Sequence, residues 1–100
     1  MVPNEFKILN HTISIVVDNE YCYKNDCYGQ FFSDEDKIIV ATKYKKNNKW
    51  VNYKPEIVKH TLYHEIVHCI LYYMHHELWD NETFVDQFSG LLCQIINTKK

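Results

Sequence analysis

The chain has 100 residues, of which 46% are hydrophobic and 24% charged, and it contains two glycines and two prolines. This length and composition predict one packed domain spanning residues 1–100 and exclude a disordered or fibrous chain. The formal net charge of −2 provides no general attraction to polyanions, so we expect neither a nucleic acid nor a membrane as a partner.

The amino terminus and the cysteines predict where the protein resides. Residues 1–6 (Met-Val-Pro-Asn-Glu-Phe) lack the basic and apolar regions of a signal peptide, and no apolar run approaches the roughly 18 residues of a membrane span. The four cysteines form no C-x-x-C pair, which favours reduced thiols, with a Cys22–Cys27 bridge as the alternative. We therefore expect a cytoplasmic protein.

The first half of the chain predicts short strands. Residues 12–17 place Ile13, Ile15 and Val17 on one face of a strand, and Asp18-Asn19 is typical of a turn after it. Residues 33–36 (Ser-Asp-Glu-Asp) favour a tight connection between two further runs. Together the apolar runs predict a small, mainly antiparallel sheet with strands at 6–8, 12–17, 27–32 and 37–42.

Residues 43–54 (Lys-Tyr-Lys-Lys-Asn-Asn-Lys-Trp-Val-Asn-Tyr-Lys) combine lysines with aromatic side chains. We interpret this segment as a solvated loop whose Trp50 and Tyr53 fold back onto the core. A basic aromatic patch for single-stranded nucleic acid is the alternative.

The second half predicts two helices. Pro55 at a first helical position and Glu56 in the first turn begin a helix that reaches Tyr73 or His75. Asp80 or Asn81 can cap a second helix that ends near Asn97. The expected fold class is therefore α+β, a small sheet followed by two helices.

His64-Glu65-Ile66-Val67-His68 lies inside the first predicted helix. Side chains four residues apart share a helix face, so His64 and His68 can present their imidazoles to one metal ion. Glu65 lies one step round the helix, close to where a metal-activated water would sit, and can act as a general base. This pattern predicts a catalytic zinc site.

Catalytic zinc needs a third protein ligand and an open position. Glu82, at the start of the second helix and followed four residues later by Asp86, is the candidate. The helix continues for roughly 10 Å beyond His68, and the five or six residues that follow can return over that distance. Glu82 can therefore lie level with His68 if the helices pack antiparallel.

These residues together resemble the gluzincin zinc peptidases, the thermolysin-like group, in which a downstream glutamate is the third ligand and an aspartate four residues later hydrogen-bonds a ligand histidine. The resemblance implies His64, His68 and Glu82 as ligands of one zinc ion, Glu65 as general base and acid, and Asp86 as the partner of a histidine. Such a partner fixes the tautomer and orientation of the imidazole.

More narrowly, residues 80–92 (Asp-Asn-Glu-Thr-Phe-Val-Asp-Gln-Phe-Ser-Gly-Leu-Leu), after the motif helix and its short strands, look like the minimal phage and mobile-element metallopeptidases of the ImmA/IrrE type and the minigluzincins. This resemblance covers roughly residues 28–97. It departs from the family at Phe88-Ser89, where relatives carry Phe-Ala, and at Asp86, where relatives of ImmA often carry Asn.

The resemblance implies a zinc-dependent endopeptidase that acts on a peptide or protein in a bacterial or phage-infected host cytosol. The interval between His68 and Glu82 is shorter than in thermolysin-like enzymes, and 100 residues leave no room for the additional domain that builds their cleft. The substrate range is therefore not implied, and neither is the oligomeric state. An extended substrate could pair with a sheet edge, and we expect that edge at residues 37–42.

Several alternatives stay open. His60 precedes His64 by four residues and could form a different ligand pair with it. His75 or His76 could stabilise an oxyanion, although exposed loop histidines explain them more simply. At the level of function, the alternatives are a zinc-stabilised interaction module without catalysis and a metal-free interaction domain.

Overall fold

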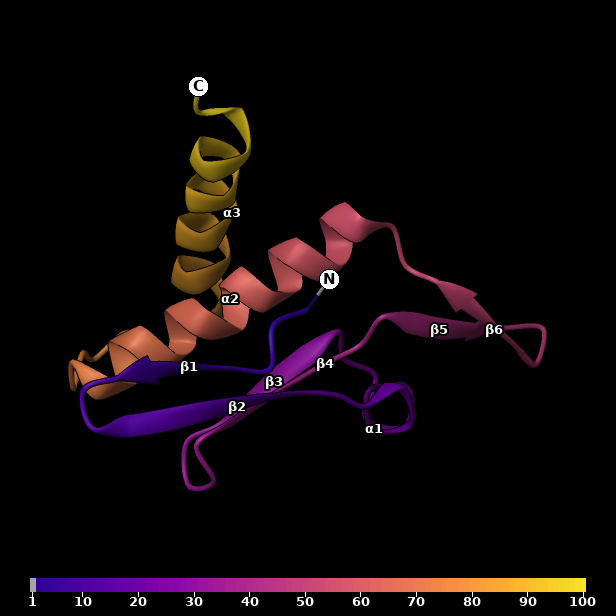
Figure 1. Cartoon of the computed structure of the whole chain (residues 1–100), viewed down its shortest axis with the longest axis horizontal. Helices are drawn as coiled ribbons and strands as arrows, with labels where there is room; N and C mark the ends of the chain where they lie inside the picture. The colour runs from indigo at the N-terminus through magenta and orange to yellow at the C-terminus, as the bar shows by residue number, and fades with distance from the viewer. Residues whose placement is uncertain (1) are drawn as a thin grey trace.

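The computed structural model describes residues 2–100, which fold into two small sheets and three helices (Figure 1). The strands are β1 (Glu5–Ile8), β2 (His11–Val17), β3 (Gly29–Phe32), β4 (Lys37–Val40), β5 (Lys43–Lys46) and β6 (Lys49–Asn52). The helices are α1 (Asn19–Lys24), α2 (Pro55–Tyr73) and α3 (Glu82–Thr98). The predicted α+β fold class is confirmed.

The larger sheet has the strand order β1-β2-β4-β3. β1 pairs with β2 and β3 with β4 in antiparallel fashion, as predicted, but the central strands β2 and β4 are parallel. A parallel pair cannot be joined by a tight hairpin and needs a crossover connection. The chain between β2 and β4 supplies it with α1 and β3.

The turn predicted at Asp18-Asn19 is wrong, because a short helix begins there. Asp18 is the N-cap of α1, and its carboxylate accepts a hydrogen bond from the backbone N–H of Tyr21 at 3.0 Å. Aspartate is favoured both in turns and at N-caps, since both leave a backbone N–H for it to bind. Cys22 on α1 is buried with Ile39 and Ala41, which holds the helix against the sheet.

The loop predicted for residues 43–54 is wrong as well. β5 and β6 form an antiparallel hairpin whose connection is Asn47-Asn48. Both asparagines have positive φ, 53° and 62°, which the two-residue turn of a tight hairpin requires. Trp50 is 38% exposed and is contacted by Lys45, 5.0 Å above its ring, and by Tyr23 of α1, so it does not reach the core as predicted. Tyr53 does, because it packs against the cluster of Cys22, Ile39 and Ala41.

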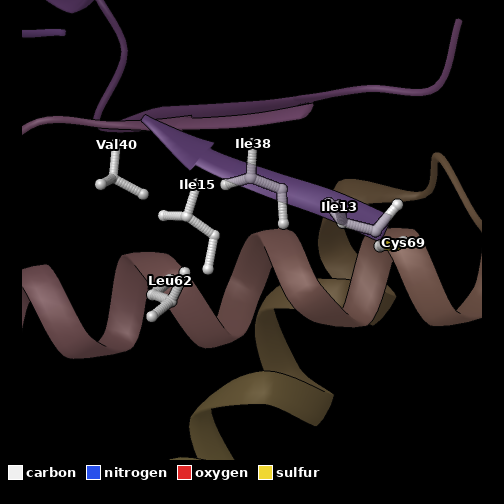
Figure 2. Packing of buried hydrophobic residues seen from close by; sticks show 6 residues of the cluster. All are labelled: Ile13, Ile15, Ile38, Val40, Leu62 and Cys69. Atoms are coloured by element: carbon white, nitrogen blue, oxygen red, sulfur yellow. The ribbon is translucent and has the colours of Figure 1, made fainter. Parts of the chain in front are cut away.

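The main core lies between the larger sheet and α2. Apolar side chains of β2 and β4, namely Ile13, Ile15, Ile38 and Val40, point toward α2, which contributes Leu62 and Cys69 to the same cluster (Figure 2). Removing one large aliphatic side chain from water stabilises the folded state by roughly 1.5–3 kcal/mol. The cluster therefore holds α2 against the sheet.

The two long helices begin where the sequence predicts. Pro55 is the first residue of α2, and Asn81 caps α3 by accepting a hydrogen bond from the N–H of Phe84 at 2.9 Å. α3 rises away from α2 at an angle in Figure 1, and contacts between them run in antiparallel order from His68–Glu82 to Lys59–Asn97. A small cluster around Val67, Leu71 and Val85 joins the two helices.

Two further expectations concern membrane-spanning helices and the oxidation state of the cysteines. Within residues 2–100, no helix is both long and apolar enough to cross a membrane. All four cysteines are free thiols, and burial raises the pKa of the Cys22 and Cys69 thiols to about 12.

Candidate metal centre

The structure brings His64, His68 and Glu82 together. One ligand atom from each side chain lies within 4.8 Å of the other two. His64 Nε2 is 2.9 Å from Glu82 Oε1, and His68 Nε2 is 3.1 Å from Glu82 Oε2. Zinc–ligand bonds of 2.0–2.1 Å in a tetrahedron separate the ligand atoms by roughly 3.3 Å, so small side-chain shifts bring these atoms to that spacing.

Backbone and carboxylate groups orient both imidazoles. His68 Nδ1 is 2.6 Å from the backbone carbonyl oxygen of Trp79, which only accepts, so Nδ1 carries the proton and donates it. His64 Nδ1 lies 3.5 Å from Asp86 Oδ1, which likewise favours a proton on Nδ1. Both imidazoles therefore present Nε2 to the space in front of Glu82, and these are the contacts that orient a metal-bound histidine.

The electrostatics of this triad favour a positive charge, supplied either by protonated imidazoles or by a metal ion. Two imidazole Nε2 atoms face one carboxylate, and a lone pair facing an acceptor is repulsive unless a proton or a metal ion lies between them. Partial burial works to raise the pKa of the Glu82 carboxyl, but the hydrogen bond with His64 and the charge of His68 outweigh it and lower the pKa. Glu82 is therefore held as a carboxylate, the form that binds a metal.

Glu65 lies on the same helix but turns toward β3. Its side chain is buried, and this burial raises the pKa of the carboxyl, while His68 and His64 work in the opposite direction. The nearby backbone of Phe31 also works to lower this pKa. A carboxylate whose pKa is raised toward neutrality is better suited to take up and release a proton.

The close approach of β3 to α2 depends on Gly29. A Cβ built there would lie 2.8 Å from the carbonyl oxygen of Ile39, 2.8 Å from Thr61 Cγ2 and 3.4 Å from Glu65 Cγ. Any larger residue would push the strand and the helix apart. Gly29 thus allows β3 to lie directly against Thr61 and Glu65, and no sequence motif indicates this role because β3 contributes no side chain to the triad.

An open cavity of about 930 Å³ adjoins the triad. His64, His68, Glu82, Glu65 and Asp86 line it on the helical side, and residues 27–31 line it on the side of β3. A volume of this size accommodates a short peptide or a small organic molecule beside the metal position. The site is thus a set of convergent ligands at the wall of a groove.

The structure separates the other histidines from the triad. His60 lines the cavity, but its Nε2 is buried next to α3, 3.8 Å from where a Cβ on Gly90 would lie, and it joins no ligand group in residues 2–100. His76 stacks on Phe84 and accepts a hydrogen bond from the N–H of Leu78. His75 and His76 are absent from the cavity lining, whereas Tyr28 belongs to it.

The expectation that residues 37–42 form a sheet edge is wrong. β4 lies between β2 and β3, with both of its sides paired, because α1 carries the chain across to make the parallel pair. The edge strand beside the cavity is β3, and its Gly29, Gln30 and Phe31 line the groove. A strand-like ligand would therefore pair with β3.

Comparison with known proteins adds no relative: no protein-family model, curated protein or solved structure matches this chain. The chemistry of the site is therefore inferred from the geometry of its own residues.

Proposed function

We propose that this protein is a zinc-dependent peptidase. The observation that carries the proposal is the convergence of His64 Nε2, His68 Nε2 and the Glu82 carboxylate on one point at the wall of an open groove. Two imidazoles and one carboxylate with an open position are a ligand set that suits zinc and is typical of catalytic zinc sites. The resemblance of the His-Glu-x-x-His and Glu-x-x-x-Asp spacing to gluzincins supports the same activity.

Each residue of the site would have a separate role in the reaction. His64, His68 and Glu82 would hold the ion, and Asp86 and the Trp79 carbonyl would keep each imidazole aimed at it. A bound zinc ion would supply a Lewis acid and lower the pKa of water. Glu65, buried beside the groove, would take the proton from the attacking water and return it to the leaving amine.

The substrate of this proposed reaction is a peptide in extended conformation. β3 borders the groove as an edge strand, so main-chain pairing with it can place a scissile bond in front of His64 and His68. The acidic residues around the groove, Glu56, Asp80 and Asp86 among them, favour a substrate without acidic side chains near the bond.

The first experiment is the zinc content of the purified protein and of Glu82→Ala, measured by elemental analysis. We expect one zinc per wild-type chain and at least about a tenfold weaker affinity in the variant, since a ligand is lost. Glu77→Ala, an exposed acid outside the triad, should bind zinc like the wild type. Wild-type protein that takes up no zinc after reconstitution would disprove the enzyme proposal.

Glu65→Gln separates catalysis from metal binding. The variant should keep its zinc, because Glu65 is not a ligand, and should lose peptide hydrolysis by roughly 10²–10⁴-fold, because the proton acceptor is gone. A mixture of unstructured peptides read by mass spectrometry measures the cleavage. If neither the zinc-loaded wild type nor Glu65→Gln cleaves any peptide, the protein is a zinc-stabilised interaction module.

A further inference from the structure

α3 carries a second apolar stripe beside the face that packs on α2, and its half-buried first member, Phe84, also contacts the cluster of Val67, Leu71 and Val85. The residues of this stripe are Phe84, Phe88, Leu91 and Ile95, and Phe88, Leu91 and Ile95 are 51%, 64% and 63% exposed. The rings of Phe84 and Phe88 lie 5.9 Å apart, so the stripe is continuous at its aromatic end. We call these four residues the outer stripe.

The outer stripe is distinct from the face that α3 buries. Val85, Ser89 and Cys93 are the buried residues of the helix, and at 3.6 residues per turn the centre of their face lies roughly 130° around the helix axis from that of the stripe. α3 is therefore apolar on two sides, although only one of them is covered in the single chain. In Figure 1 the carboxyl-terminal end of α3 lies far from every strand. A contiguous exposed patch of large apolar side chains is rare on a monomer and marks an interaction surface.

The spacing of the outer stripe fits another helix. Successive members are four, three and four residues apart, which is the alternation of a two-helix seam. In an antiparallel pair of α3 helices centred between Phe88 and Leu91, Phe88 faces Leu91 of the second copy. Phe84 then faces Ile95 of the second copy. Each ring packs against an aliphatic side chain, so the stripe is complementary to itself in this orientation.

Charge also favours the antiparallel orientation. The segment before α3 carries the exposed acids Glu77 and Asp80, and the end of α3 is followed by Lys99 and Lys100. Antiparallel packing places these lysines beside the acids of the second copy, and it also sets the two helix dipoles in opposite directions. Parallel packing would place lysines beside lysines and acids beside acids, which is repulsive.

We propose that this protein forms a twofold-symmetric dimer through antiparallel packing of the outer stripes of two α3 helices. The interface is isologous, because each copy contributes the same four side chains. Glu82 and Asp86 point from the other side of α3 toward α2, so the dimer leaves the groove open. The proposal does not depend on zinc binding or on peptidase activity.

The test is sedimentation analysis of the full chain from about 1 µM to about 1 mM, the range in which a modest interface is half assembled. The wild type should approach twice the 12.1 kDa mass of one chain. Leu91→Glu and Ile95→Glu should each weaken association by at least about tenfold, because each places a charge in the seam. Gln94→Glu, the same charge on an exposed residue of α3 outside the stripe, should stay dimeric.

Circular dichroism of each variant shows whether the chain still folds. Two separate variants in the seam keep the test valid if one of them does not fold. A wild type that stays monomeric at the highest concentration would overturn the proposal. Equal effects of Leu91→Glu and Gln94→Glu would also overturn it, since the stripe would then have no special role.

A charge exchange tests the orientation. The variant Lys99→Glu with Lys100→Glu should self-associate more weakly than the wild type, and so should Glu77→Lys with Asp80→Lys. Mixing the two should restore the dimer, because one copy is then acidic at both ends of α3 and the other basic at both ends, so each end contact joins opposite charges. In a parallel pair each double variant would only exchange one like-charge contact for another, so double variants that associate as strongly as the wild type would contradict the antiparallel arrangement.

Discussion

Asp36 links three parts of the chain through its side chain. One carboxylate oxygen accepts a hydrogen bond from the Tyr73 hydroxyl at the end of α2, and the other lies 2.8 Å from His11 Nδ1 at the start of β2. Its backbone has a φ of 48°, a conformation that aspartate and asparagine tolerate better than most residues. The hydrogen bonds with Tyr73 and His11 lower the pKa of the Asp36 carboxyl below its ordinary value of 3.8.

This pKa shift predicts how stability depends on pH. A carboxyl whose pKa is lowered by folding stabilises the protein above the pKa it has when unfolded, and that stabilisation is lost as the pH falls through the folded value. Asp36→Asn keeps the backbone conformation but removes the charge, so it should melt at a lower temperature than wild type at pH 6. The difference should shrink below pH 3.8.

Thermal unfolding followed by circular dichroism at several pH values measures this difference. Asp34→Asn, an exposed residue of the same turn, serves as the control and should leave the melting temperature nearly unchanged. A gap between wild type and Asp36→Asn that stays constant down to pH 2.5, roughly a unit below the ordinary pKa, would contradict the assigned hydrogen bonds.

At the scale of elements, α2 is in contact with β3 on one side and with α3 on the other, and a glycine lies at each contact. Gly29 brings β3 onto Thr61 and Glu65, with no room for a Cβ. At Gly90 on α3, a Cβ would lie 3.8 Å from His60 Nε2, which is ordinary van der Waals contact. The two contacts therefore differ in how tightly they are packed.

Alanine at the two glycines should have opposite effects. Gly29→Ala should lower the free energy of unfolding by about 1–3 kcal/mol, because backbone or side chain must shift to admit the methyl group. Gly90→Ala should raise it by up to about 1 kcal/mol, because alanine is the better helix former and the space exists. Urea denaturation of both variants gives the values. A Gly29→Ala variant as stable as the wild type would argue against the tight β3–α2 contact, and destabilisation by Gly90→Ala would argue against the space beside His60.

The same elements show which parts of the fold the sequence could predict. Apolar alternation in residues 12–17 and Pro55 before an apolar run indicated β2 and α2, because each signal is local. The hairpin β5–β6 was missed although Asn47-Asn48 between alternating residues is a turn signal, since the five lysines of residues 43–54 suggested a solvated loop. α1 was missed because Asp18 fits a turn and an N-cap equally well.

For the whole molecule, metal binding and folding should be coupled. The three candidate ligands join α2 to the first residue of α3, so a bound ion would fasten together helices that are otherwise held by a small apolar cluster, the Lys59–Asn97 hydrogen bond and the His64–Asp86 contact. Ligand present at 100 times its dissociation constant stabilises the native state by about 2.7 kcal/mol. In a domain of this size that raises the melting temperature by roughly 10–20 °C.

Differential scanning calorimetry with zinc and after chelation checks this coupling. The wild type should melt at a lower temperature once zinc is removed, whereas Glu82→Ala should melt at nearly the same temperature in both conditions. A wild-type melting temperature that chelation leaves unchanged would mean that no ion is bound between α2 and α3.

The sequence alone determined the α+β class, the two long helices and the spacing that allows His64, His68 and Glu82 to meet, because helix period, capping residues and chain reach are local properties. The tertiary structure alone decided that β2 and β4 are parallel, that β3 and not β4 borders the groove, and that β3 lies against Glu65 at Gly29. It also left the outer stripe of α3 uncovered. These features depend on which distant segments pack together, and no periodicity along a single segment records that choice.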